Sequence, residues 1–344
     1  MTPSSPQGPR TAVMICGHGS RDEAAVREFN TLATHFRDRM PDYDVESGFL
    51  EFALPVIRTG LDKLRDRGAE RIICIPGMLF AAGHVKNDLP SEVNNFAAEH
   101  PDLEVAFGRE LAIDHRLLKA STERIEQAEA AANAGTPVAR EDTLLMVVGR
   151  GTRDPDANSN VCKVTRMLWE GMGFGWAETS YSGVAYPLVD AGLARAVKLG
   201  FKRIIVFPYF LFTGILVRRI YDWADAAAAA HPEVEIVKAP YLNDHPYLID
   251  CFVDRVQEVL TGDNVMNCSL CKYREQIIGY EGDQGAVQVG HHHHVRGAGT
   301  EADPHDHGAH QHAHGHSHGH GHHHHHHHGH DHDHGHSHGE APEK

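Results

Sequence analysis

Three side chains that could bind a divalent cation lie at or after the ends of three predicted strands in the N-terminal part of the chain. His18 follows the apolar strand at 11–16, Glu51 ends the strand at 44–51, and His84 lies in the loop after the apolar strand at 71–76. Two imidazoles and a carboxylate are a common ligand set for divalent transition metals. A histidine in the segment GHGS could also be an ordinary turn residue, so His18 alone does not decide between these interpretations.

The elements around these residues predict a parallel α/β sheet. The short apolar runs are typical of strands that are buried on both faces, and each run is followed by a segment with helical periodicity. Such alternation implies parallel strands joined by right-handed crossovers. Ligands of open α/β sheets bind at the carboxyl ends of the strands, where the three candidate residues would meet.

The same pattern occurs a second time at an offset of 132 residues, which indicates an internal duplication. The clearest match is GHGSRD at 17–22 with GRGTRD at 149–154, and the strand RIICIP at 71–76 matches RIIVFP at 203–208. The fold class that we predict is therefore α/β, with two tandem duplicated domains, each a parallel sheet flanked by helices.

This duplication divides the chain into six predicted segments. They are a polar leader (1–10), an N-terminal domain (11–128), a linker (129–142), a C-terminal domain (143–262), a segment with a CxxC motif (263–290) and a His-rich tail (291–344). The tail contains 24 of the 31 histidines and no apolar periodicity, so we expect it to be disordered.

The second copy lacks all three candidate ligands. Arg150, Gly183 and Leu216 stand where the first copy has His18, Glu51 and His84. A purely structural role would not predict that the three positions differ together while the surrounding scaffold residues match. Independent drift in three surface loops is the alternative. We therefore expect one active site, in the first copy.

Composition excludes several classes of protein. The net charge of −15 disfavours binding to a nucleic-acid backbone. The leader lacks the apolar core of a signal peptide, and no run of apolar residues is long enough for a membrane span. The cysteine pattern is typical of a reducing compartment, so we expect a cytoplasmic protein. There is no P-loop and no GxGxxG, hence no sign of a nucleotide cofactor.

Cys268 and Cys271 form the CxxC pair, which could be half of a zinc site, half of an iron–sulfur site or a redox pair. The pair follows the last predicted helix instead of opening one after a strand, which disfavours the thioredoxin-like alternative. The His-rich tail is expected to bind Co²⁺, Ni²⁺, Zn²⁺ or Cu²⁺ as a store or delivery arm, or else to be a solvating low-complexity tail.

The motifs GHGSR at 17–21, FLE at 49–51 and the Gly-His at 83–84 resemble those of the CbiX-type sirohydrochlorin chelatases, long form. The resemblance covers about 11–262 and implies a class II chelatase fold that inserts Co²⁺ into sirohydrochlorin or a close relative in cobalamin synthesis. It implies that His18 and His84 bind the metal and act in catalysis, and that Glu51 occupies an acidic position of the family.

The segment MNCSLCKYR at 266–274 is similar to the C-terminal MxCxxCxYR of long CbiX proteins, which implies an iron–sulfur protein. A [4Fe–4S] cluster on Cys268 and Cys271 would need further ligands, from non-Cys groups or from a second chain in a homodimer.

Sirohydrochlorin is a polyanion, so cations near the cleft should hold it, and Lys86, Arg150 and Arg153 are candidates by their loop positions. Solvated surface charge is the alternative for each of these cations. Neutral imidazoles could hold the metal and accept the pyrrole protons. Two other functions remain open: a ferrochelatase that makes sirohaem, and a cobalt or nickel storage protein or metallochaperone. A two-lobed periplasmic binding protein is disfavoured because no export signal is present.

Overall fold

The structure is a computed structural model, and it describes residues 9–266 and 268–290. The His-rich tail and most of the leader, for which we made predictions above, lie outside these residues. In the described part of the chain, no helix combines the length and the hydropathy that a membrane span requires.

Two four-stranded parallel sheets form the framework, as the sequence predicted. The first sheet has the order β2-β1-β3-β4 and the second has the order β6-β5-β7-β8. The strands are β1 (Thr11–Gly17), β2 (Asp44–Phe49), β3 (Arg71–Pro76), β4 (Glu104–Phe107), β5 (Thr143–Gly149), β6 (Trp176–Tyr181), β7 (Arg203–Pro208) and β8 (Glu235–Lys238). The identical strand order reproduces the sequence repeat.

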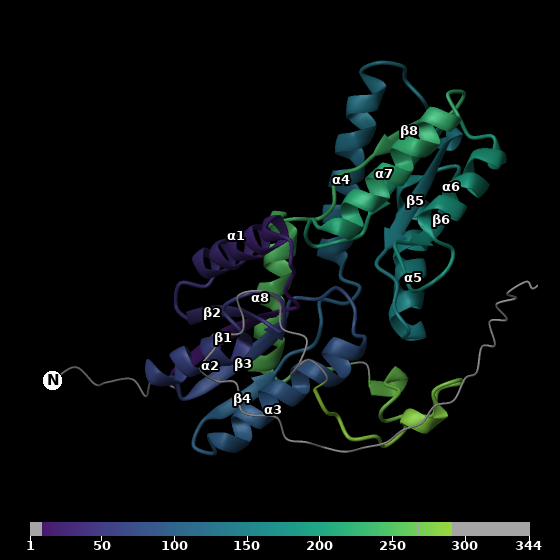
Figure 1. The fold of residues 1–344 in the computed structure, drawn as a ribbon. Helices are drawn as coiled ribbons and strands as arrows, with labels where there is room; N and C mark the ends of the chain where they lie inside the picture. The colour runs from purple at the N-terminus through teal and green to yellow at the C-terminus, as the bar shows by residue number, and fades with distance from the viewer. Residues whose placement is uncertain (1–8, 267, 291–344) are drawn as a thin grey trace, which may run out of the picture. The chain divides into compact units, whose positions relative to one another are not determined.

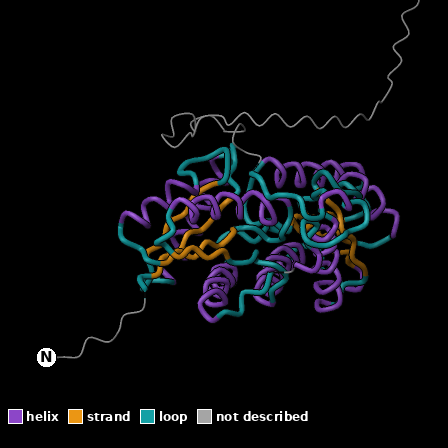
Figure 2. Tube along the Cα trace, turned by 90° about the horizontal axis from the view of Figure 1, so that it is seen from below, coloured by secondary structure: helices purple, strands orange, loops and turns teal. Residues whose placement is uncertain are grey.

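Helices flank both sheets, so that the strands lie in a middle layer (Figure 2). The α-helices are α1 (Glu23–Arg39), α2 (Ile57–Asp66), α3 (Leu89–Glu99), α4 (His115–Asn133), α5 (Pro155–Met172), α6 (Val189–Ala196), α7 (Ile215–Ala230) and α8 (Pro246–Thr261). The short helical turns are η1 (His84–Asp88), η2 (Arg140–Asp142), η3 (Val197–Leu199), η4 (Cys268–Leu270) and η5 (Glu281–Asp283). Among these turns η1 is a π-helix and directly precedes α3.

Alternate residues of each central strand enter different hydrophobic cores. In β1, Val13 and Ile15 face the helices α1 and α8, whereas Met14 and Cys16 face α2 and α3. Since successive side chains of a strand point to opposite faces, a strand covered on both sides must be apolar throughout. This requirement explains the uninterrupted apolar run that marks β1 in the sequence.

The last helix of each repeat packs on the sheet of the other repeat. Helix α8 contacts β3 and α1 of the first sheet, and α4 contacts α5, β7 and β8 of the second sheet. In Figure 1 the green helix α8 lies among the purple and blue elements of the first sheet. One continuous core includes residues of both sheets, such as Ile73 and Ile205, together with α4 and α8. The two sequence repeats are therefore joined into one packed unit.

Candidate metal site and substrate cleft

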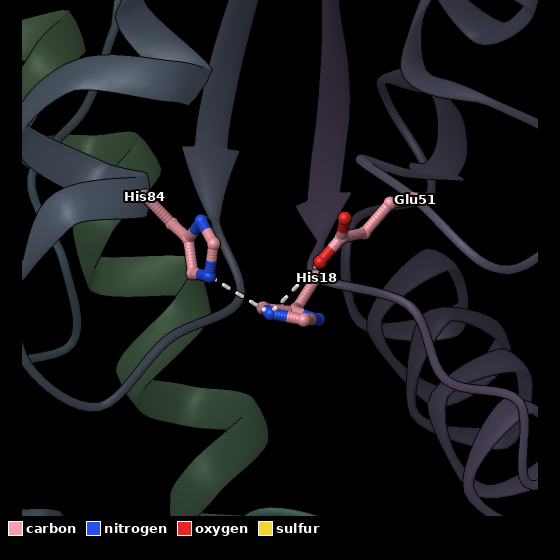
Figure 3. A group of neighbouring side chains, drawn as sticks. All are labelled: His18, Glu51 and His84. Carbon is pink, nitrogen blue, oxygen red and sulfur yellow. Dashed lines mark hydrogen bonds and ion pairs between the residues drawn. The ribbon is translucent and has the colours of Figure 1, made fainter. Parts of the chain in front are cut away.

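The three candidate ligands come together at the carboxyl end of the first sheet. His18 follows β1, Glu51 lies two residues beyond β2, and His84 is the first residue of η1 after β3. Since β1 lies between β2 and β3, their three loops are neighbours in space. The ligand atoms of these residues all lie within 4.8 Å of one another (Figure 3).

The geometry brings both imidazoles together at their Nε2 atoms. His18 Nε2 lies 2.9 Å from His84 Nε2 and 3.5 Å from Glu51 Oε1. A tetrahedral ion with metal–nitrogen bonds of about 2.0–2.1 Å would set the two nitrogens roughly 3.3 Å apart. A shift of a few tenths of an ångström would therefore let both nitrogens bind one divalent ion. Both His side chains are partly exposed, at 30% and 25%, whereas Glu51 is 5% exposed, so an ion can reach the site from the side of the imidazoles.

Tight backbone contacts fix the loops that carry His18 and Glu51. The Glu51 backbone N–H donates to the His18 carbonyl at 3.0 Å. Gly19 has a φ of +95°, and a Cβ atom built on it would lie 1.7 Å from the Glu51 carbonyl oxygen. Phe52 also has a positive φ, of 64°, as does its counterpart Val184 in the second repeat, at 65°, so this rare backbone conformation belongs to the repeated loop. Glycine is therefore required at position 19 to bring the two ligands together.

Beside this site lies a cleft of about 660 Å³ that residues of both repeats line. Its walls are mainly aromatic and aliphatic, and its polar lining includes His18, His84 and Arg150. The apolar side chains of the lining include Phe29, Phe49, Phe52, Met78, Leu79, Phe80, Tyr209, Phe210, Leu211, Phe212, Ile215, Leu216 and Val217. Ligand pockets are commonly apolar with a few placed polar groups, and this cleft has that character.

The second repeat places a cation where the first has a candidate metal ligand. Arg150, the counterpart of His18, lines the cleft and is near enough for electrostatic interaction with Glu51. Burial lowers the pKa of the Arg150 guanidinium, and the charge of Glu51 offsets part of this effect. An arginine is effectively always charged in proteins. The cleft thus contains a fixed positive charge beside the candidate metal site.

Lys86 and Arg153, the other predicted substrate-binding cations, do not line the cleft. The side chain of Lys86 is 2% exposed, and its Nζ lies 2.8 Å from Asp154 Oδ2 and 3.1 Å from Asp156 Oδ2. Burial by itself would lower the pKa of Lys86, but the hydrogen bond and charge of Asp154, with a further contribution from Asp156, raise it overall. Lys86 is thus an ion-pair bridge between the two repeats, and Arg153 is exposed.

Sequence analysis missed two polar residues near the site. Arg21 lines the cleft and stacks its guanidinium 4.9 Å from the centre of the Phe52 ring. The repeated motif could have identified it, because Arg21 is the counterpart of Arg153. Asp88 accepts a hydrogen bond from His84 Nδ1 at 2.9 Å. The four-residue spacing of His84 and Asp88 on one helical turn was the available signal.

The CxxC segment provides no complete metal site among the residues that the structure describes. Cys271 is buried, and the side chain of Cys268 lies outside the described part. In this part, the one group of three or more potential ligands is His18, Glu51 and His84. The described side chains therefore do not supply the ligand set of a [4Fe–4S] cluster, and the cluster stays a prediction.

Fold and site together define a class of protein: a duplicated α/β protein whose described residues include a His–His–Glu group that could hold a divalent metal, beside an apolar cleft. The chain belongs to the CbiX family, whose model matches residues 12–128 and 144–259. This match confirms the family resemblance and the duplicated fold predicted from the sequence, and it makes the protein a metal chelatase by family.

Among curated relatives, a sirohydrochlorin cobaltochelatase of Priestia megaterium is 38% identical over 272 residues, which are 78% of this chain and 86% of the relative. A sirohydrochlorin ferrochelatase of the same species is 30% identical, over 73% of this chain and 91% of the relative. A sirohydrochlorin cobaltochelatase of Sulfurisphaera tokodaii matches 33% of this chain but 91% of its own length, at 30% identity.

Solved structures give the same family. The structure of SirB from Bacillus subtilis with Fe³⁺ has a TM-score of 0.65 and 27% identity, and the match covers 74% of this chain and 97% of SirB. The sirohydrochlorin chelatase SirB from Bacillus subtilis subspecies spizizenii in complex with cobalt has a TM-score of 0.62 and 25% identity, over 74% of this chain and 96% of that chain.

Proposed function

We propose that this protein inserts Co²⁺ into sirohydrochlorin, with His18, His84 and Glu51 as its catalytic residues. The observation that carries the proposal is the convergence of these three ligands at the edge of an apolar cleft. Such a site can hold a metal ion beside a flat macrocycle, which is the arrangement that metal insertion requires.

The reaction can be followed at the named side chains. Co²⁺ is a substrate, and the Nε2 atoms of His18 and His84 would hold it loosely enough for transfer, since they belong to partly exposed side chains. The macrocycle nitrogens bind the metal as both pyrrole N–H protons leave. Imidazole and carboxylate groups within hydrogen-bonding reach can accept protons, a role open to both histidines and to Glu51. Metal binding and proton release balance in charge, so no redox step is needed.

The cleft walls suit the rest of the substrate. The aromatic rings of Phe80 and Phe212 can pack against the apolar faces of the macrocycle. Its peripheral carboxylates can pair with the guanidinium groups of Arg21 and Arg150, both of which line the cleft. These contacts would orient the macrocycle so that one face meets the metal ligands.

Cobalt and iron are the competing metals for this site. The more similar of the two Priestia relatives is a cobaltochelatase, and the His-rich tail favours Co²⁺ or Ni²⁺ over Fe²⁺ in the order of imidazole affinities. Ferrochelatase relatives support the alternative of iron insertion for sirohaem. A metallochaperone would bind metal without inserting it, and it gives no reason for a substrate-sized apolar cleft beside the ligands.

Anaerobic assays with the full chain and sirohydrochlorin test the proposal. Co²⁺, Fe²⁺ and Ni²⁺ are supplied in turn, and the macrocycle absorbance is followed against a protein-free reaction. We expect the fastest insertion with Co²⁺ and none above background for a His18→Ala/His84→Ala double variant. Insertion preferring Fe²⁺ would instead support a ferrochelatase, and tight Co²⁺ binding without insertion would support a carrier.

Iron and sulfide analysis of anaerobically purified protein tests the cluster at Cys268 and Cys271, with a Cys271→Ser variant as its control. Size-exclusion chromatography coupled to light scattering tests the homodimer. Both remain predictions, as does the cytoplasmic location.

A further inference from the structure

Asp88 occupies the place of a residue that orients a metal ligand. Its Oδ2 atom lies 2.9 Å from His84 Nδ1, on the side of the ring opposite the Nε2 atom that faces His18. A carboxylate at this distance accepts a hydrogen bond from Nδ1–H and so favours the tautomer whose lone pair is on Nε2, the atom that would bind the metal. Figure 3 shows the Nε2 side of His84 turned towards His18.

Asp88 does not cap the helix that follows it. Asp88 directly precedes α3, where an aspartate would commonly cap the helix, yet its side chain makes no capping hydrogen bond. The residue is buried, at 4% exposure. Its counterpart in the second repeat is Ile220, so the repeat that lacks the three ligands also lacks this carboxylate.

The other oxygen of Asp88 is held by Asn87. Asn87 Nδ2 donates to Asp88 Oδ1 at 2.9 Å and to the Val289 carbonyl at 2.8 Å, and Asn87 Oδ1 accepts from the Val289 backbone N–H at 3.0 Å. Asn87 is 2% exposed. A chain of hydrogen bonds thus runs from the backbone of Val289 through Asn87 and Asp88 to His84.

Residues 288–290, here called the strap, lie along the turn that carries His84. Gln288 Nε2 donates to the Lys86 carbonyl, and the Gly290 backbone N–H donates to Ser91 Oγ at 3.2 Å. The turn itself is the π-helix η1, a form that often marks functional sites in proteins. The strap therefore contacts η1 at Lys86 and Asn87, and it contacts the first turn of α3 at Ser91.

We propose that Asp88 is a positioning residue for the His84 imidazole and that the strap, acting through Asn87, fixes the orientation of Asp88. This inference rests on the proposed chelatase function. The strap, which follows the second repeat in the sequence, would then help to set the geometry of the active site.

The test compares variants of the full chain at Asp88. For Asp88→Ala we expect kcat/KM for Co²⁺ to fall about 10–100-fold, the usual effect of losing a residue that orients a metal ligand. Asp88→Asn should lose less, because an amide oxygen can still accept the Nδ1–H. The KM for sirohydrochlorin should stay unchanged, which a general loss of structure would not predict.

Asn87 and Asn264 form a matched pair for testing the strap. Asn264 also ties the C-terminal segment to the first repeat by two backbone contacts, from the Arg109 N–H at 3.0 Å and to the Phe107 carbonyl at 3.0 Å. We expect Asn87→Ala to lower kcat/KM for Co²⁺ about 3–10-fold, as an indirect effect on the same ligand, and Asn264→Ala to leave it near wild type.

An Asp88→Ala variant that inserts Co²⁺ within twofold of the wild-type rate, or equal losses for Asn87→Ala and Asn264→Ala, would overturn the inference. Failure of the wild-type chain itself to insert any metal would refute the proposed function instead.

Discussion

Replacing Lys86 with methionine should destabilise the fold strongly. The Lys86 side chain is 2% exposed, and its two carboxylate partners, Asp154 and Asp156, are 5% and 8% exposed. Methionine would fill a similar volume but leave both carboxylates without their cation. Removing one partner of a buried ion pair costs about 3–5 kcal/mol, because the remaining charge stays buried.

This cost can be converted into a melting temperature. A change of 1 kcal/mol shifts the Tm of chains of about 150–250 residues by roughly 2–4 °C, so Lys86→Met should lower Tm by about 6–20 °C, or somewhat less in a longer chain. Differential scanning calorimetry at neutral pH measures the shift. The control is Lys272→Met, which removes a more exposed pair with Asp283 at 2.7 Å and should cost no more than about 1 kcal/mol.

The pKa of Lys86 adds a pH dependence of defined sign. Its pKa in the folded protein is raised above the ordinary 10.5, so the stabilisation is complete below pH 10.5 and is lost as the pH rises through the folded pKa. The Tm difference between wild type and Lys86→Met should therefore shrink only in strongly alkaline buffer. Equal Tm values at neutral pH would refute this account of the ion pair.

Three further predictions concern the site. Deleting 291–344 should leave the insertion rate nearly unchanged at saturating Co²⁺ and lower it at limiting Co²⁺. Insertion rates measured over a Co²⁺ titration test this, and an equal decrease at all Co²⁺ concentrations would contradict a delivery role for the tail. Arg150→Leu should raise the KM for sirohydrochlorin about tenfold or more, because it removes one hydrogen bond to a charged group of the substrate. Arg153 is exposed, so Arg153→Leu should change this KM little. Gly19→Ala should abolish insertion, since its Cβ would lie 1.7 Å from the Glu51 carbonyl oxygen. The matching variant Gly151→Ala, whose Cβ would lie 1.9 Å from the Gly183 carbonyl oxygen, should lower Tm with a smaller effect on the insertion rate.

The repeat made most of the fold predictable. Buried parallel strands carry a continuous apolar run, and two copies of the same run at one offset confirm each other. The proximity of the three candidate ligands was predictable for a related reason: parallel strands bring their carboxyl ends to one edge of the sheet, so residues far apart in sequence, such as His18 and His84, had to meet.

Contacts that depend on three-dimensional packing were not predictable. Lys86 stands in the loop that carries His84 and therefore resembled a substrate-binding cation, but the sequence could not show that Asp154 and Asp156 surround it. The last helix of each repeat, α4 or α8, packs on the sheet of the other repeat, an arrangement here called the helix exchange. The sequence periodicity could not predict it, because a helix has the same apolar face whichever sheet it covers.

That exchange has a consequence for synthesis on the ribosome. One face of the first sheet, including Ile73 and Ile75, is covered by α1 together with α8, and α8 is the last long helix of the described chain. The strands β1 to β4 therefore emerge and can pair long before their covering helix has been translated. The N-terminal repeat, which contains all three candidate metal ligands, keeps this apolar face uncovered until residues 246–261 have left the exit tunnel. A nascent chain stopped short of α8 would therefore expose a surface for chaperones to bind.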